Sequence, residues 1–447
     1  MKNHLVFHGI VIHSVSLDEL EILQNAALVI DADGRISAFY RDIAHDDPRL
    51  QIDGARFHRL GPRNFIIPGF VDTHNHAPQW SMRGLGQGLH ILDWLDQVTF
   101  PHEARFSDPV YAKRVYESCV DGFLKQGITT ASYYGSKHAE ATRILADTCK
   151  AEGQRAFVGK CNMDRNAPDY LRDQSADSSL QETEECIRHI RAIDPEGVLV
   201  RPVITPRFAI CCTPDLLRGL GDIAKKDAQL AIQTHFHEAE QEINATKELF
   251  PGFKSEADMY ASYDLMSKRS ILAHCTFMNE YDMDRVRDLE CGVAHCPISN
   301  MTVGGGFMTA PVREFLRRNI KVGLGTDSGG GFSSSILDNI RQAVIASNAR
   351  EVVSKGKDKA LSLEEVFYLA TVGGARVCCL EDTIGNFEVG KQFDAIWVTT
   401  EPDGAMTVHE EEDSIRTVFE KFIMTGDDRN ISRVYVRGRL VKGSEGQ

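Results

Sequence analysis

Short apolar runs alternate with longer segments of helical periodicity through the middle of the chain. The apolar runs lie at residues 65–71, 128–133, 156–160, 198–205, 230–234, 271–273, 292–294 and 322–325. Helix-compatible segments fall between them, among them residues 110–125, 182–193 and 238–249. Alternating strands and helices are typical of a parallel sheet. Eight such runs predict an α/β fold, a (β/α)8 TIM-like barrel, in which catalytic groups sit at the C-terminal ends of the strands.

Both ends of the chain are rich in strands instead. Residues 1–65 hold several short β-type runs, two of which are separated by a turn signal at residues 31–34. Residues 393–398 and 434–441 are further runs of the same kind near the other end of the chain. A chain of 447 residues also exceeds what a single hydrophobic core of up to ~300 residues accommodates. We therefore expect a small β-sandwich domain made from residues 1–65 and 382–447, with a barrel domain, residues 66–381, inserted between its halves.

The composition narrows the class of protein. Lys and Arg total 50 and Asp and Glu total 64, so the formal net charge is −14, which disfavours nucleic-acid polymers and anionic membranes as partners. No apolar run approaches the ~20 residues of a membrane-spanning helix, and the first residues lack the pattern of a signal peptide. The 11 scattered cysteines include no C-x-x-C pair and are typical of reduced thiols. These features predict a cytoplasmic enzyme with no membrane or nucleic-acid partner.

A pair of histidines follows the first apolar run. His74 and His76 are two residues apart, and alternate residues of an extended segment point to the same side. Two imidazoles on one side can reach a single zinc ion at ~2.0–2.1 Å each. A surface pair would be the simpler explanation of an isolated H-x-H, but this pair directly follows a buried-strand signature. The sequence therefore predicts two metal ligands here.

A histidine and a glutamate follow the fifth apolar run, as the histidine pair follows the first. His235 ends the run and Glu238 comes three residues later, so a tight strand-to-helix turn would bring both into one cavity. His235 would bind the metal and Glu238 would carry protons. His237 repeats the H-x-H spacing, but we expect the turn to direct it away. We interpret Glu240 and Glu242 as part of a solvent-facing helix surface.

Further candidates follow the last three runs. Asp327 ends a glycine-containing run, and a carboxylate there can bind zinc and accept a proton from water, although Asp also favours helix N-caps. His274 could hydrogen-bond the same water or bind a second metal. For His295 a similar role and a place in a buried network are equally open.

These positions together resemble the amidohydrolase superfamily, with its H-x-H after the first strand, histidines after the fifth and sixth, and an aspartate after the eighth. Within it, the sequence resembles the guanine deaminase family. The matching stretches are residues 68–79, 92–95, 99–101, 206–208, 294–297, 323–327, 385–391 and 426–431. The resemblance implies zinc-dependent hydrolysis of guanine to xanthine and ammonia by a homodimer.

The resemblance also implies individual roles. One zinc ion per subunit would be held by His74, His76, His235 and Asp327. Asp327 would accept a proton, Glu238 would shuttle protons, and His274 would orient the attacking water. Gln79 and Arg207 would hydrogen-bond the purine, with Phe208 against its ring. The implied substrate-binding residues are His76, Gln79, Arg207, Phe208, His235, Glu238 and Asp327.

Rival functions remain open at this stage. Another deaminase of the same superfamily could act on an oxidised guanine, a pterin, cytosine or adenosine. A barrel used as a non-catalytic scaffold would lack metal ligands, and none is missing here. A binuclear hydrolase of cyclic amides would carry a bridging modified lysine after the fourth strand, where Thr205, Pro206 and Arg207 stand instead.

Overall fold

A parallel barrel forms the larger part of the molecule. The computed structural model describes residues 4–303, 306–402, 404, 406–409 and 411–444. The barrel strands pair in the order β14-β13-β12-β11-β10-β8-β7-β6, with a short extension, β9, beside β10. Their bounds are β6 Phe70–His76, β7 Ile128–Tyr134, β8 Arg155–Gly159, β9 Cys161–Asn162, β10 Val200–Pro206, β11 Ala231–Phe236, β12 Ser270–His274, β13 Gly292–His295 and β14 Lys321–Leu324. The predicted barrel is confirmed.

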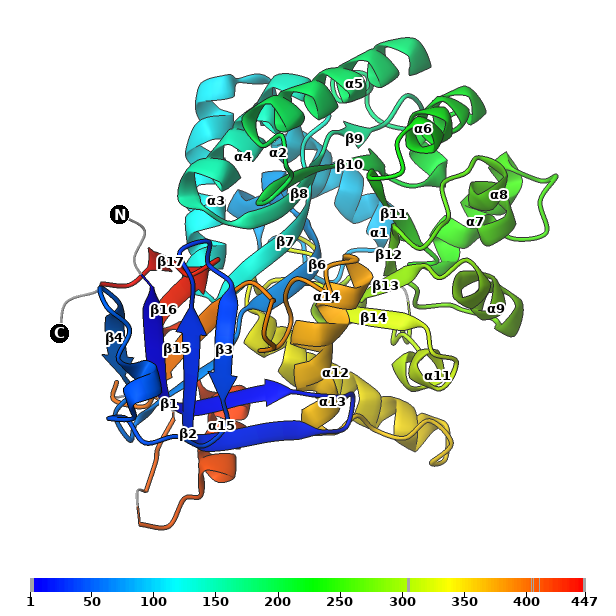
Figure 1. Ribbon diagram of the computed structural model, residues 1–447. Helices are drawn as coiled ribbons and strands as arrows, with labels where there is room; N and C mark the ends of the chain where they lie inside the picture. The colour runs from blue at the N-terminus through cyan, green and yellow to red at the C-terminus, as the bar shows by residue number, and fades with distance from the viewer. Residues whose placement is uncertain (1–3, 304–305, 403, 405, 410, 445–447) are drawn as a thin grey trace.

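Most of the helices connect the barrel strands or follow the last of them, and they surround the barrel (Figure 1). Those of the first half are α1 Ile91–Trp94, α2 Phe100–Ala104, α3 Pro109–Lys125, α4 Ala139–Glu152, α5 Ala176–Ile193 and α6 Pro214–Lys226. Those of the second half are α7 Glu240–Leu249, α8 Glu256–Ser262, α9 Glu280–Asp288, α10 Pro297–Thr302, α11 Val312–Arg317, α12 Ile336–Val353, α13 Leu363–Tyr368, α14 Gly374–Val377 and α15 Ile415–Thr425. Across the described ranges, no helix combines the length and the apolar character needed to cross a membrane.

The two ends of the chain share a second sheet, as expected from their strand-rich sequences. Its order is β17-β16-β15-β5-β1-β2-β3, with β4 also paired to β1. The strands are β1 Leu5–Ser14, β2 Leu20–Ile30, β3 Ile36–Tyr40, β4 Arg56–Arg59, β5 Asn64–Pro68, β15 Ala395–Thr399, β16 Ile431–Val436 and β17 Arg439–Lys442. Figure 1 shows the blue N-terminal strands beside the red C-terminal ones, to one side of the barrel.

The first apolar run differs from its prediction. Residues 65–71 are not one barrel strand, because the chain changes sheets at Gly69. Strand β5 pairs with β15 and β1 in the terminal sheet, whereas β6 starts the barrel at Phe70. A Cβ at Gly69 would overlap the side chain of Thr129, so only glycine fits this crossing. Hydrophobic periodicity cannot detect such a change, because both strands are buried.

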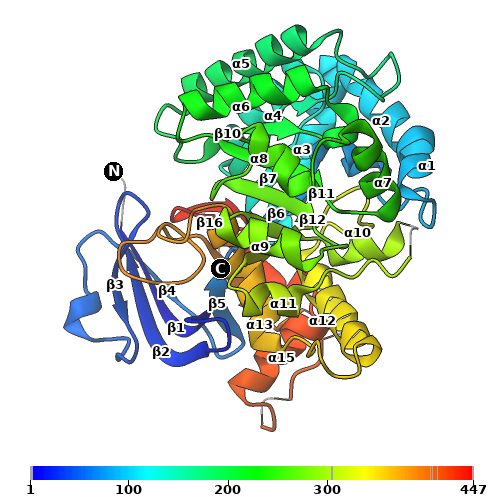
Figure 2. The same cartoon turned by 90° about the vertical axis from the view of Figure 1, so that its right-hand side faces the viewer.

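Aromatic side chains join the terminal sheet to the helices beside it. Phe65 of β5 lies 5.7 Å from Phe422 and 6.4 Å from Phe419, both on α15, in edge-to-face geometry. Phe367 of α13 lies 5.0 Å from Phe419. Figure 2 shows α12, α13 and α15 gathered beside this sheet. These contacts fix the terminal sheet against the barrel, and the C-terminal ends of the barrel strands stay free for a site.

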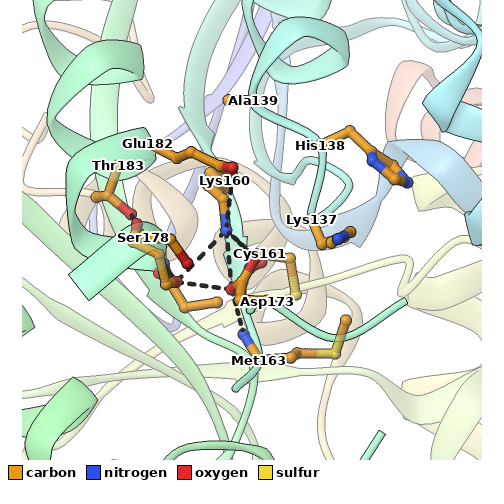
Figure 3. A network of polar contacts seen from close by, with 12 residues as sticks. Lys137, His138, Ala139, Lys160, Cys161, Met163, Asp173, Ser178, Glu182 and Thr183 are labelled. Atoms are coloured by element: carbon orange, nitrogen blue, oxygen red, sulfur yellow. Dashed lines mark hydrogen bonds and ion pairs between the residues drawn. The ribbon is translucent and has the colours of Figure 1, made fainter. Parts of the chain in front are cut away.

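A buried ion pair anchors the chain that follows β8. Lys160 is fully buried, and its Nζ lies 2.9 Å from Asp173 Oδ1 and 3.6 Å from Glu182 Oε2 (Figure 3). Asp173 Oδ2 also accepts a hydrogen bond from the backbone N of Met163, at 3.1 Å. Burial alone would lower the pKa of Lys160, but the nearby carboxylates raise it above the usual value. The buried ammonium group of Lys160 therefore stays charged.

We expect Lys160→Met to lower the free energy of unfolding by about 3–5 kcal/mol, because it leaves the buried carboxylate of Asp173 without its partner. Denaturant titration followed by circular dichroism measures the change. Lys113→Met is the matched control, because Lys113 pairs with Glu117 at the exposed surface of α3 and such pairs contribute about 0–1 kcal/mol. Equal losses in the two variants would contradict the role given to the buried pair.

Candidate active site

The four predicted metal ligands meet at the C-terminal ends of three barrel strands, β6, β11 and β14. His74 and His76 lie within β6 and point to the same side of it, as the alternation predicts. His235 lies near the end of β11, and Asp327 follows β14. All four residues are buried, with exposed fractions of 1–7 %. Residues separated by more than 250 positions in the sequence are thus brought into one cluster.

Three nitrogen atoms and one oxygen atom face one another in this cluster. His74 Nε2 lies 3.2 Å from Asp327 Oδ1, and His76 Nε2 lies 3.6 Å from the same oxygen. His76 Nε2 is 3.0 Å from His235 Nε2. His74 Nε2 is buried and has no hydrogen-bond partner. Nitrogen and carboxylate ligands in this number are those that zinc prefers, so the residues present fit a metal ion.

The protonation of His235 favours metal binding through Nε2. Its Nδ1–H donates to the backbone carbonyl of Arg207 at 2.6 Å, which leaves the lone pair on Nε2. Burial lowers the pKa of His76 and of His235 well below the usual value. Neutral rings with inward lone pairs are the form that a metal requires.

A buried aspartate closes the barrel beneath the ligands. Asp72 accepts hydrogen bonds from Thr326 N at 2.8 Å and Thr326 Oγ1 at 2.6 Å. Asp327 N in turn donates to the carbonyl of His74 at 2.8 Å. Asp327 has a φ of 42°, in the left-handed region that non-glycine residues rarely adopt. The bonds between β6 and the chain after β14 therefore hold the Asp327 carboxylate over the histidines.

Glu238 and His274 lie beside the metal cluster. His274 Nε2 is 3.6 Å from Glu238 Oε1, and His274 Nδ1–H donates to Asn300 Oδ1 at 2.8 Å. One ligand atom from each of Glu238, His274 and Asp327 lies within 4.8 Å of the other two. Burial raises the pKa of Glu238. A carboxyl group with a raised pKa is suited to giving and taking protons near neutral pH.

A cavity opens directly over the cluster, and every residue predicted to bind substrate lines it. These residues are His76, Gln79, Arg207, Phe208, His235, Glu238 and Asp327. Trp94 of α1 and Glu242 of α7 also face it. Polar groups thus converge on one side of a cavity with aromatic walls, which is the usual form of a small-molecule site.

Glu103 is the buried acid that the sequence analysis missed. It lies on α2 and is 1 % exposed. Its carboxylate accepts from Arg207 Nη1 at 2.7 Å and from Gln79 Nε2 at 2.8 Å. Burial alone would lower the pKa of Arg207, but the carboxylate of Glu103 raises it above the usual value. The motif at residues 99–101 ends two positions before Glu103, and no spacing rule distinguishes it from a solvent-facing glutamate.

One prediction about the acidic run is wrong. Glu242 was expected on a solvent-facing surface, but it is 1 % exposed and its Oε2 accepts from the backbone N of Glu238 at 3.2 Å. Residues of α8 cover this side of α7, so its polar face is partly buried. Glu240 is exposed as predicted.

The two remaining histidines lie outside the cluster. His237 has a φ of 48° at the end of β11, and its Nδ1 lies 3.0 Å from the carbonyl oxygen of Phe277. It faces a second cavity together with Glu256, as the expected turn implies. His295 is buried beside Arg350 in a further cavity. Burial lowers the pKa of His295 to about 3, so it is a neutral buried side chain.

Gly329 packs against the amide of Gln79. It has a φ of 122°, and a Cβ there would overlap Gln79 Oε1 and Gln79 Cβ. We expect Gly329→Ala to lower the free energy of unfolding by about 1–3 kcal/mol and to raise KM for the substrate by displacing that amide. Gly54→Ala is the control, because Gly54 has a φ of 70° but no neighbour within 4 Å. A KM unchanged in Gly329→Ala would contradict this contact.

Comparison with known proteins identifies the class to which this fold and site belong. The model of the amidohydrolase family matches residues 65–441. The chain belongs to the amidohydrolase family. Proteins of this family depend on a bound metal, in agreement with the cluster at the barrel rim.

Within this family the chain is similar to guanine deaminases. It is 39 % identical to the guanine deaminase of Dictyostelium discoideum, over 98 % of each chain. It is 40 % identical to a probable guanine deaminase of Schizosaccharomyces pombe, over 98 % of this chain and 84 % of the other. The structure of a guanine deaminase from C. acetobutylicum with guanine bound in its active site has a TM-score of 0.90 and 32 % identity, and it covers 98 % of this chain and 100 % of that one. The resemblance drawn from the sequence is confirmed.

Proposed function

We propose that this protein hydrolyses guanine to xanthine and ammonia. The observation that carries the proposal is the cavity in which a His, His, His, Asp cluster faces a buried glutamate, an arginine and a glutamine. Similarity to guanine deaminases over the full length of the chain supports the same reaction.

The metal we propose is one zinc ion per subunit. The residues that would hold it are His74, His76, His235 and Asp327. Their nitrogen and carboxylate donors suit zinc better than magnesium or calcium, which favour oxygen ligands. A bound zinc ion supplies Lewis-acid chemistry, making water acidic enough to ionise near a pH of ~7.

Asp327 and Glu238 carry out the proton transfers of the reaction. Asp327 accepts a proton from the attacking water, and His274 Nε2 orients that water. Glu238 donates a proton to the ring nitrogen beside C2, which makes C2 more electrophilic. A C2–O bond forms and the C2–N bond to the amino group breaks. Glu238, now ionised, takes the remaining proton of the hydroxyl added at C2 and passes it to the amino nitrogen, so ammonia departs and the carbonyl of xanthine remains. The proton held by Asp327 then returns to Glu238, whose carboxyl group lies within 4.8 Å of it, and both groups regain their starting forms.

Arg207, Gln79 and Phe208 would hold the purine in place. Arg207 donates to an acceptor on the purine edge, for which guanine offers O6 and N7. Gln79 Oε1 is buried without a partner in the protein, so it is free to accept from a ring N–H. Phe208 supplies an apolar surface for the ring. With the purine edge held in this way, C2 lies toward Glu238.

A substrate panel tests this proposal. Purified zinc-loaded protein is assayed for ammonia release from guanine, 8-oxoguanine, a pterin, cytosine and adenosine, and xanthine formation is followed by absorbance. We expect turnover of guanine with a kcat/KM well above that of the others. Faster turnover of any other substrate, or no ammonia from guanine, would overturn the proposal.

The domain boundaries and the assembly are also proposals. We propose one domain from residues 1–65 and 382–447 and another from residues 66–381. The chain changes sheets at Gly69, four residues after the proposed boundary, because β5 extends to Pro68 in the terminal sheet. The family resemblance supports a homodimer located in the cytoplasm. Light scattering after size-exclusion chromatography tests the dimer, and a monomer mass at micromolar concentration would contradict it.

A further inference from the structure

The buried carboxylate of Glu103 contacts two side chains that line the cavity, Gln79 and Arg207. We propose, building on the proposed function, that Glu103 is a positioning residue that makes the site selective for 6-oxopurines. It does so by fixing the donor and acceptor directions of Gln79 and Arg207. Glu103 lines no part of the cavity itself, so its effect on a ligand passes through these two side chains.

The contacts leave the carboxylate no freedom. Glu103 Oε1 accepts from Gln79 Nε2 at 2.8 Å and from Arg207 Nη2 at 3.2 Å. Glu103 Oε2 accepts from Arg207 Nη1 at 2.7 Å. The guanidinium and the carboxylate thus form a two-bond pair, and the exposed fractions of all three residues are only 1–2 %. Paired hydrogen bonds of this kind fix the plane of both groups.

The direction of the Gln79 amide follows from this contact. An ionised carboxylate only accepts hydrogen bonds, so the amide must turn its NH2 group toward Glu103. Gln79 Oε1 then faces away, and it is a buried oxygen without a partner in the protein. Gly329 packs against the same amide and limits its movement. Glu103 therefore places an acceptor in the cavity wall and prevents the amide from flipping.

This arrangement is complementary to one kind of purine edge. A 6-oxopurine presents the O6 acceptor beside the N1–H donor. Guanidinium N–H groups of Arg207 match the first, and Gln79 Oε1 matches the second. A 6-aminopurine presents the opposite polarity, a donor beside an acceptor. A freely rotating amide could serve either edge, whereas an amide held by a carboxylate serves only the first.

Two ligands that lack an amino group at C2 test the inference without any turnover. Hypoxanthine has the O6 and N1–H edge, and unsubstituted purine lacks both groups. We expect the zinc-loaded wild-type protein to bind hypoxanthine at least ~10-fold more tightly than purine, as for a well-formed bidentate contact. Glu103→Gln should reduce this ratio to about threefold or less, because a neutral amide can donate to Gln79 Oε1 and release its orientation. Isothermal titration calorimetry measures both dissociation constants.

A matched control separates positioning from general damage. Asp394 pairs with Arg155 at 3.1 Å, both are buried, and Arg155 begins β8 at the end of the barrel away from the site. Asp394→Asn thus also neutralises the partner of a buried arginine. We expect it to lower the melting temperature and to leave the binding ratio unchanged. An equal fall of the ratio in both variants, or an unchanged ratio in Glu103→Gln, would overturn the proposal.

A second variant covers the case in which Glu103→Gln does not fold. Glu103→Asp keeps the negative charge beside Arg207 but withdraws the oxygen from Gln79 by one methylene length. We expect it to fold and to show a ratio between those of wild type and Glu103→Gln, and a wild-type ratio would count against the inference. Guanine turnover by the wild-type protein is measured in parallel. If the wild-type protein turns over guanine but the binding ratio of the Glu103 variants equals that of the wild type, only the role of Glu103 is refuted. If the binding ratio falls in the Glu103 variants but the wild-type protein does not turn over guanine, only the proposed reaction is refuted.

Discussion

Glu238→Gln is expected to lower kcat for guanine by ~10²–10⁴-fold while the metal content stays at the wild-type level. The amide has nearly the same shape as the carboxylate, but it can neither donate an acidic proton to the ring nitrogen nor pass one to the leaving amino group. Glu238 lies beside His274 and is not one of the four proposed ligands. The loss should therefore fall on the chemical step and spare metal binding.

The measurement combines the xanthine absorbance assay with atomic absorption on the same samples. Glu240→Gln is the matched control, because Glu240 carries the same functional group two residues further along and is exposed. We expect it to retain wild-type kcat. If Glu238→Gln kept wild-type turnover, proton transfer by Glu238 would be refuted. If it lost the metal together with activity, Glu238 would be a ligand.

Local periodicity explains why much of the fold could be predicted. Strand and helix alternation depends on neighbouring residues, so the eight barrel strands were located, and β7 and β10 start within two residues of their predicted positions. The split at Gly69 was not foreseen, because it depends on which sheet a strand joins. Helix α5 begins at Ala176, before the predicted segment, because Ser175 caps it. Neither apolar spacing nor composition contains that tertiary information.

The same distinction applies to the site. The H-x-H of His74 and His76 could be predicted because both residues lie on one strand with a period of two. Glu103 could not, because its burial depends on how α2 packs in the long connection between β6 and α3. Glu242 was assigned to solvent because the packing of α8 against α7 has no signature in either segment. Side chains that recur at strand ends can be found from sequence, and those contributed by connecting helices require the structure.

His235→Ala is expected to lose metal and activity together. The substitution removes one of four proposed ligands, the one whose Nδ1–H is anchored on the carbonyl of Arg207. Without the metal, the pKa of the water rises from ~7 toward the much higher value of bulk water, so the nucleophile nearly disappears at neutral pH. We expect the zinc content to fall well below that of the wild type and kcat to fall by several orders of magnitude. Chelator treatment of the wild-type protein should produce the same loss, and added zinc should restore it.

His237→Ala supplies the matched control for this experiment. His237 belongs to the same H-x-H spacing, but its ring faces Phe277 and Glu256 rather than the cluster. Its removal should leave both the metal content and kcat close to wild type, even if the melting temperature falls. The pair of variants therefore tests geometry and not sequence spacing. Full metal content in His235→Ala, or a loss of metal in His237→Ala alone, would show that the ligand set has been assigned to the wrong histidine.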